Sequence, residues 1–292
     1  MSSGPKDARE LLAFYRDAGV DALVSETPVD RMADEPVAEP PPARARPPAA
    51  RAANEGVAGG ERVREYFQEQ LQEARRPDPA AALPPPDVAA VAAREAAKSA
   101  ATLDELRALL EGFTGCALRA TATQLVFADG NPAARVMFVG EAPGYEEDMS
   151  GKPFVGRSGK LLDRMMAAIG LDRTTAYIAN VVPWRPPGNR TPTPQETAIC
   201  LPFIRRQIEL ANPDILVCLG GPSAQTLLGI RDGITRTRGR WFDYDTGTRE
   251  IRAIATFHPA FLLRSPLQKR LAWRDFIAIK KALAAAVTPS QT

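Results

Sequence analysis

The residues best suited to chemistry in this sequence stand at the ends of short apolar runs. Glu141 follows one run, Asn180 ends a second, Gly220 follows a third and His258 closes a fourth. His258 is the only histidine of the chain, and imidazole is the side chain whose ordinary pKa suits chemistry near neutral pH. A lone histidine is most often structural, but its place after a buried run and before a proline favours a functional role. The pattern predicts a site with a carboxylate, an amide and an imidazole.

An acidic, Gly-rich segment surrounds the first of these positions. The sequence Gly140-Glu141-Ala142-Pro143-Gly144 ends the apolar run, and Glu146, Glu147 and Asp148 follow. Further Gly and Pro residues predict a loop as far as a helix that begins near Ser158. An ordinary connection needs only one or two turn residues. The density of Gly, Pro and acidic residues therefore favours a ligand site at the end of a strand.

The end of this segment resembles a phosphate-binding loop only superficially. A Walker motif needs a Gly five residues before its Gly-Lys and a Ser or Thr after it, whereas this chain has Phe154 before Gly159-Lys160 and Leu161 after it. No nucleotide cofactor is expected. The predicted helix start, with Arg157 and Ser158, suits a single phosphate of a nucleic-acid backbone instead.

The elements that must position these side chains form an α/β fold. Continuous apolar runs at 136–139, 177–182, 215–219 and 252–257 alternate with helical patterns. Such runs are typical of parallel strands that are buried on both faces. The sequence predicts a three-layer α/β/α sandwich with a central four-stranded, mainly parallel sheet, and an edge strand at 239–244. The carboxyl ends of parallel strands lie along one edge, so the side chains that follow them can converge.

Composition divides the chain into three parts. Residues 1–25 read as a short helical segment, and residues 26–97 as an Ala/Pro-rich, mostly disordered linker with a possible helix at 61–76. The folded domain is expected over 98–287, with a helix near 88–100 leading into it. Residues 1–97 hold 12 Lys and Arg against 17 Asp and Glu, and residues 98–292 hold 25 against 18. A basic folded part is consistent with a polyanionic partner.

The hydrophobic runs and the cysteine count also indicate where in the cell the protein is located. No apolar run approaches the ~18 residues of a membrane span, so no membrane association is expected. Three cysteines, an odd number, argue against a disulfide framework and for a reducing, cytoplasmic location.

Several of these motifs together resemble the family 4 uracil-DNA glycosylases. The resemblance covers residues 108–285 in order and at compatible spacing, and it rests on the segments GEAPG at 140–144, Glu147-Asp148, PFVG at 153–156, Asn180 and HPAFLL at 258–263. It implies a monomeric DNA repair enzyme that flips uracil out of DNA and hydrolyses its N-glycosidic bond without magnesium. The alternative is a non-catalytic reader of uracil-containing or damaged DNA. Residues 1–25 lie outside the resemblance and could bind a protein partner.

The resemblance also assigns roles to individual residues. Phe154 would stack on the flipped base, Asn180 would bind its O4/N3 edge, and His258 would donate to O2 of the leaving uracil. Glu141 would stabilise the sugar cation and orient the water. The remaining assignments are Gly140 and Ala142 in the base pocket, Glu147 and Asp148 as alternative carboxylates, Leu262 as a wedge in the base stack, and Arg157, Ser158, Arg264 and Ser265 on DNA phosphates.

The cysteines depart from the family pattern. The resemblance implies a structural 4Fe-4S cluster held by four cysteines, and Cys200 and Cys218 fit the last two. Cys116 fits the second, but the position of the first is Phe113. A cluster on three cysteines is the expectation, with either a non-cysteine fourth ligand or a labile assembly. The remaining alternative is that no cluster forms and the thiols are buried and free.

Overall fold

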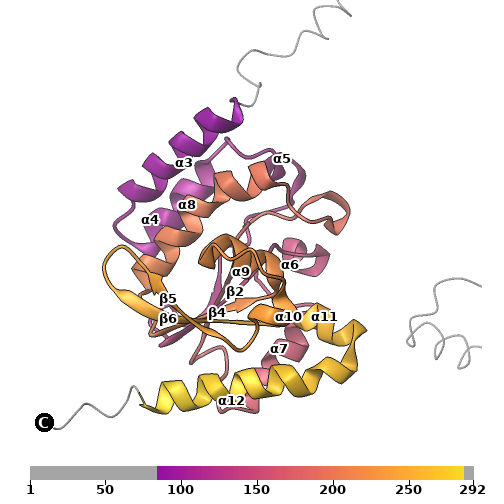
Figure 1. Ribbon diagram of the computed structural model, residues 1–292. Helices are drawn as coiled ribbons and strands as arrows, with labels where there is room; N and C mark the ends of the chain where they lie inside the picture. Colours follow the sequence, from indigo (N-terminus) through magenta and orange to yellow (C-terminus); the bar gives the residue numbers. More distant parts are fainter. Residues whose placement is uncertain (1–83, 286–292) are drawn as a thin grey trace, which may run out of the picture. The chain divides into compact units, whose positions relative to one another are not determined.

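The computed structural model describes residues 84–285, which are organised around a six-stranded mixed sheet (Figure 1). The strand order is β1-β3-β2-β4-β6-β5. The bounds are β1 (Asp129–Gly130), β2 (Val136–Gly140), β3 (Tyr177–Asn180), β4 (Ile215–Leu219), β5 (Trp241–Asp245) and β6 (Glu250–Thr256). The four central strands are parallel, and the two outer strands, β1 and β5, are antiparallel to their neighbours.

The sheet is therefore larger than predicted. Its parallel centre matches the four expected strands, and β5 occupies the position of the expected edge strand. The prediction of four strands omitted β1, which contributes only Asp129 and Gly130 to the sheet. Two residues carry no alternation of apolar and polar side chains, so no sequence pattern indicates such a strand.

Helices cover both faces of the sheet, which confirms the predicted three-layer sandwich (Figure 1). One layer contains α3 (Pro86–Ser99), α4 (Leu103–Gly112), α8 (Pro194–Ala211) and α9 (Gly221–Leu228), and the other contains α7 (Arg157–Ala167) and α12 (Lys269–Ala285). Successive residues of β2 alternate between the layers: Met137 packs under the first, and Phe138 stacks on Phe276 of α12 with ring centroids 6.0 Å apart. The shorter elements are α5 (Leu118–Thr121), α6 (Tyr145–Ser150), α10 (Ile234–Thr237), α11 (Pro259–Arg264) and the 3-10 turns η1 (Pro187–Asn189) and η2 (Pro266–Gln268).

Local signals fix the long crossover helix α8. The Thr193 hydroxyl accepts from the Glu196 N–H at 3.2 Å, and the Glu196 carboxylate accepts from the Thr193 N–H at 2.7 Å. Pro194 occupies the first helical position, where no backbone N–H is needed. The helix ends at Asn212, which is left-handed with φ 47°. Thr193 and Glu196 thus form a capping box at the start of α8.

The predicted domain boundary at residue 98 is wrong, because it falls inside α3. Ala89, Ala93 and Ala97 repeat at one-turn intervals and are buried against α8, so the small side chains allow close helix packing. The helix expected near 88–100 is confirmed as α3, and its stripe of buried alanines makes it part of the folded domain. The expected helical segment 1–25, the possible helix 61–76 and the rest of the linker as far as residue 83 lie outside the described residues. No helix within 84–285 is long and apolar enough to cross a bilayer.

The loop expected before Ser158 is confirmed between α6 and α7, and the three acids that precede it form helix α6, which was not predicted. Glu146, Glu147 and Asp148 lie in its first turn, where the positive end of the helix dipole favours carboxylates. Gly144 precedes the helix, and Gly151, with φ 71°, ends it.

The order of the parallel strands places a crevice at one edge of the sheet. From β2 the chain crosses to β3 on one side, and later strands continue from β4 on the other side. The connections that leave β2 and β4 therefore diverge, and ligands bind in α/β sheets at such a point, beyond the carboxyl ends of the strands.

Candidate active site

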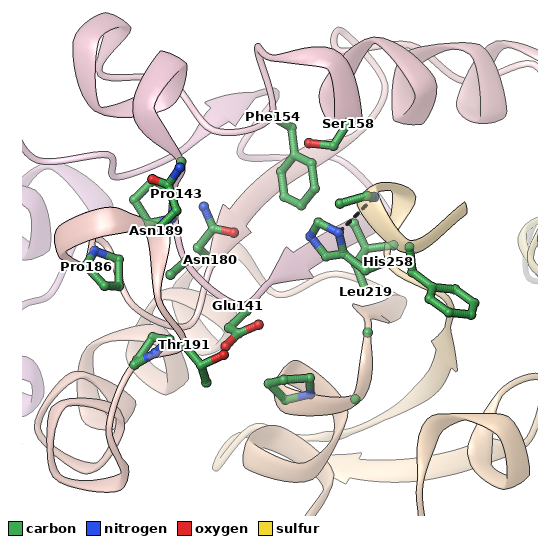
Figure 2. A pocket seen from close by; sticks show the side chains of 18 of the residues that line it. Glu141, Pro143, Phe154, Ser158, Asn180, Pro186, Asn189, Thr191, Leu219 and His258 are labelled. Atoms are coloured by element: carbon green, nitrogen blue, oxygen red, sulfur yellow. Dashed lines mark hydrogen bonds between the residues drawn. The ribbon is translucent and has the colours of Figure 1, made fainter. Parts of the chain in front are cut away.

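A cavity of about 480 Å³ lies at this edge of the sheet (Figure 2). It is lined by the residues that follow or end the four parallel strands: Glu141 after β2, Asn180 at the end of β3, Gly220 after β4 and His258 after β6. The structure thus brings together the four positions that the sequence singled out. The volume is in the range of small-molecule sites.

Asn180 lines the cavity and has an unpaired amide oxygen. Its side chain is buried, and its Oδ1 has no hydrogen-bond partner among the described residues. Gly140 makes this placement possible: a Cβ atom there would lie 2.5 Å from Asn180 Oδ1 and 2.6 Å from the Phe154 ring. Any larger residue at position 140 would therefore displace both side chains. The amide is positioned to read a hydrogen-bonding edge of a ligand.

Phe154 forms an aromatic wall of the same cavity. Its ring lies 5.5 Å from the imidazole of His258, centroid to centroid, and Figure 2 shows it between Asn180 and His258. Its backbone is left-handed, with φ 55°, which is strained for an aromatic residue. The Phe154 carbonyl accepts a hydrogen bond from Arg173 and packs so closely on Gly159 that a Cβ atom there would lie 1.7 Å from it.

His258 is held as a neutral imidazole. It caps the N-terminus of α11, and its Nδ1 accepts from the Ala260 N–H at 3.1 Å, so the ring proton of the neutral form belongs on Nε2. Burial lowers the pKa of His258 to about 4; the positive charge of Arg264 acts in the same direction, and Glu147 opposes it. The site therefore contains a neutral Nε2–H donor rather than an imidazolium at physiological pH.

Glu141 is the carboxylate with free hydrogen-bonding capacity in the cavity. It is half-buried, and burial raises the pKa of its carboxyl, while the neighbouring Thr191 side chain opposes the rise. Its Oε1 has no hydrogen-bond partner among the described residues. Figure 2 shows Glu141 beside Thr191. A partly desolvated carboxylate with a free oxygen suits general-base or electrostatic chemistry.

Comparison with known proteins identifies the family. The family model described as the uracil DNA glycosylase superfamily matches residues 127–277. The chain is 40% identical over 179 residues to the type-4 uracil-DNA glycosylase of Archaeoglobus fulgidus, a match that covers 60% of this chain and 90% of that relative. It is 46% identical over 153 residues to the type-4 enzyme of Thermotoga maritima, which covers 52% of this chain and 78% of the relative. This chain belongs to the type-4 uracil-DNA glycosylase family.

In this type-4 family member, the two alternative carboxylates hold the backbone together. Glu147 accepts from the N–H groups of Gly144, Val155 and Gly156 at 3.1, 3.0 and 2.9 Å. Asp148 is buried and accepts from the Thr123 N–H at 2.8 Å and its hydroxyl at 2.9 Å. Glu147 also lines the cavity, whereas Asp148 does not contribute to its wall. Glu147 shapes the loop that carries Phe154, Asp148 holds the segment at Thr123, and the oxygens of both acids are already engaged.

Three of the four residues expected on DNA phosphates line the cavity or the hollow beside it. Ser158 and Arg264 line the cavity, and Arg157 lies beside them in an adjoining surface hollow. Arg157 and Arg264 are exposed, and Ser265 is half-buried at the end of α11. Ala142 lines the cavity as expected.

Leu262, the residue expected to act as a wedge, is buried in the structure. Leu262 is 1% exposed and packs with Phe257 and Ala272, so it is not available to enter a base stack. Its neighbour Leu263 is 37% exposed and lines the surface hollow that also contains Arg157. One residue of shift on a helix rotates a side chain by about 100°, which explains the difference.

The cysteines of this type-4 family member do not fit a four-thiolate cluster. Cys116 and Cys200 are buried with their Sγ atoms 4.0 Å apart, and Cys218 is buried within β4. No group of three or more His, Cys, Asp and Glu side chains within residues 84–285 is placed to hold a metal ion. Phe113 occupies the position of the missing cysteine, with its ring 5.1 Å from that of Phe203. The expected cluster of the family therefore lacks a matching donor set here.

One wall of the cavity was missed from the sequence. The loop after β3 contributes Pro186, Asn189, Arg190, Thr191 and Pro192 to the lining. The sequence identified this stretch only as a long Pro-rich loop. The available signal was its position, because it follows Asn180 at the carboxyl edge of the sheet, where the other cavity segments also begin.

Proposed function

We propose that this chain excises uracil from DNA by hydrolysing the N-glycosidic bond of deoxyuridine and leaves an abasic site for base excision repair. The observation that carries the proposal is the convergence of three groups on one cavity: the unpaired amide of Asn180, the ring of Phe154 and the neutral Nε2–H of His258. Membership of the type-4 family and the relatives' name support the same activity.

Recognition of uracil follows from its hydrogen-bonding edge. The glycosidic bond is out of reach in a duplex, so the nucleotide must first rotate out of the stack into the cavity. The Asn180 Oδ1 then accepts from N3–H, and its amide NH₂ donates to O4. Cytosine presents an acceptor at N3 and a donor at position 4, so the same amide orientation opposes both groups. Phe154 stacks on the flipped base, and Gly140 leaves room for it.

His258 stabilises the leaving group. Bond cleavage transfers negative charge to the uracil ring, including O2, and the Nε2–H of His258 donates to that oxygen. The imidazole needs no proton uptake, because its lowered pKa keeps it neutral. One aimed donor in a water-poor site typically lowers the barrier by about 2.7–4 kcal/mol.

Glu141 acts on the opposite side of the reaction. Departure of uracil leaves positive charge on the sugar, and a nearby carboxylate stabilises that charge and orients the attacking water. Glu141 has the free oxygen for this role, whereas the oxygens of Glu147 and Asp148 hold backbone and side-chain donors. Its raised pKa also requires the pH to lie above that value for the carboxylate to be ionised.

The DNA strand lies across the cavity mouth in this proposal. Arg157 and Arg264 contact phosphates, together with Ser158 and Ser265. Leu263, which is exposed beside Arg264, enters the space left in the base stack.

The test is excision from an oligonucleotide with a single uracil, in the absence of magnesium. We expect an abasic product, with strand breaks only after alkali, and a loss of about 10²-fold or more in Asn180→Ala and His258→Ala. Asn131→Ala is the control, because Asn131 bonds Ala133 in a turn at the opposite end of the strands. Retention of the base by the wild-type protein would overturn the proposal and favour a non-catalytic reader, which binds the oligonucleotide without cleaving it.

We also propose a cellular location for the enzyme. The three cysteines within the described residues form no disulfide and are buried, which supports a reducing, cytoplasmic location. A monomeric state and a protein partner for residues 1–25 stay predictions.

A further inference from the structure

The cysteines of this chain depart from the family pattern at Phe113. A 4Fe-4S cluster normally takes four protein ligands, most often cysteine thiolates. The whole chain has three cysteines and one histidine, and that histidine is His258 in the active-site cavity. Neither a fourth cysteine nor a spare histidine therefore remains for a cluster at Cys116, Cys200 and Cys218.

Phe113 fills the position of the missing ligand with an aromatic ring. It follows α4 and is half-buried. Its ring meets Phe203 of α8 edge-on, with centroids 5.1 Å apart and planes at 66°. It also lies against the backbone of Gly115, where a Cβ atom would come within 2.5 Å of it. Phe203 is buried and stands three residues after Cys200, on the same side of α8.

The two nearest thiols pack against each other rather than around a central space. Cys116 Sγ and Cys200 Sγ are 4.0 Å apart, in direct contact, and both side chains are at most 1% exposed. Together with Phe113 and Phe203 they belong to the apolar core that joins α4, α8 and the sheet. The elements that a cluster would cross-link are thus already joined by apolar packing.

We propose that this family member folds without an iron–sulfur cluster, and that Phe113 closes the space where the first cluster ligand would stand. The test is the iron and acid-labile sulfide content of the full chain, purified without oxygen so that a labile cluster survives. We expect less than ~0.1 iron per chain and no absorbance band near ~400 nm. About three or four irons per wild-type chain would overturn the proposal.

Two variants test the role of Phe113 itself. Phe113→Cys restores the four-thiolate set, and Phe113→Ala opens the same space without a ligand. We expect iron to rise at least about tenfold in Phe113→Cys over Phe113→Ala when both are expressed with iron supplied. Equal iron in the two variants would overturn the assignment to Phe113. The metal content is read independently of excision, so the outcome does not depend on the proposed function.

A second, independent observation concerns the strained backbone of Phe154. The guanidinium of Arg173 donates to the carbonyls of Pro153, at 3.2 Å, and of Phe154. The same group is anchored by Asp163 at 3.0 Å and Asp129 at 2.6 Å. One planar side chain thus ties α7 and β1 to the loop that holds Phe154 at φ 55°.

We infer that Arg173 is a positioning residue for the base-stacking ring; this rests on the proposed function. In Arg173→Lys the charge is retained, but the planar set of donors is lost. We expect single-turnover excision to fall about tenfold to a hundredfold, with unchanged affinity for DNA that carries an abasic site. Arg135→Lys is the matched control, because Arg135 pairs with Asp214 at 2.6 Å and does not line the cavity.

These experiments distinguish failure of the proposed function from failure of the positioning role of Arg173. If the wild-type protein does not excise uracil, the proposed function fails. If it does and Arg173→Lys excises uracil at the wild-type rate, only the positioning role fails. An equal loss of excision and of abasic-site binding in Arg173→Lys would show a general structural role and also overturn it.

Discussion

The neutral state of His258 predicts a specific dependence of stability on pH. Its pKa is lowered from 6.5 to about 4 by burial, so the unfolded chain binds more protons than the folded chain between these values. The stability contributed by the neutral imidazole is therefore complete above pH ~6.5 and lost as the pH falls towards ~4. A shift of this size corresponds to a loss of about 3 kcal/mol over that window.

The assay compares the wild-type protein with His258→Gln, whose amide does not titrate. Urea unfolding at pH ~7 and ~4.5 gives the free energy of unfolding of each. We expect the wild-type protein to lose about 2–3 kcal/mol more than the variant on acidification. Other groups that titrate in this range, including Glu141 with its raised pKa, are common to both proteins and cancel in the difference.

Nuclear magnetic resonance provides the direct measurement. The chain has a single histidine, so its ring signals need no further assignment. A titration midpoint near 6.5 in the folded protein, or parallel stability curves of the two proteins, would refute the reasoning and with it the neutral Nε2–H donor.

Three further predictions concern the cavity and its rim. Glu141→Gln should lower single-turnover excision about 10²-fold or more while DNA binding persists, and the wild-type rate should fall on acidification through the raised pKa of Glu141, as a pH–rate profile would show. Asn180→Asp should lower excision of uracil and raise the ratio of cytosine to uracil excision, because a carboxylate accepts from the cytosine amino group; paired oligonucleotides measure this ratio. Leu262→Ala should reduce the free energy of unfolding by about 2–5 kcal/mol in urea, whereas Leu263→Ala should change it by less than about 0.5 kcal/mol and slow excision from duplex more than from single-stranded DNA.

The parts of the fold that were predicted are those with a strong local pattern. The apolar run that contains Phe138 is long enough to indicate a buried strand, and Thr193 with Glu196 marks the start of α8. Helix α3 was expected near 88–100, but its place inside the folded domain follows only from the packing of its alanine stripe on α8. Strand β1 is too short to show any sequence pattern. Only its antiparallel pairing with β3 defines it as a strand.

The part of the site that could be predicted from the sequence consists of the residues at the ends of the parallel strands. Asn180 and His258 stand at positions that a parallel sheet must bring to one edge, so topology alone places them. Thr191 belongs to a loop whose path depends on packing, and nothing in its local sequence indicates a cavity wall. Leu262 and Leu263 differ only by their phase on the short helix α11, which requires the tertiary contacts of Phe257 and Ala272 to decide.

The unpaired polar atoms give a separate argument for where this protein acts. Three buried side-chain atoms within the described residues have no hydrogen-bond partner, and two of them, Glu141 Oε1 and Asn180 Oδ1, belong to residues that line the same cavity. Leaving a buried polar group unpaired destabilises a fold by about 1–3 kcal/mol, and a ligand that completes Glu141 and Asn180 would explain why these two are retained. The nearby acids Glu147 and Asp148 have the same chemistry but are fully engaged. Of these three acids only Glu141 combines a position in the cavity wall with a free oxygen, which is why we propose it as the reacting acid.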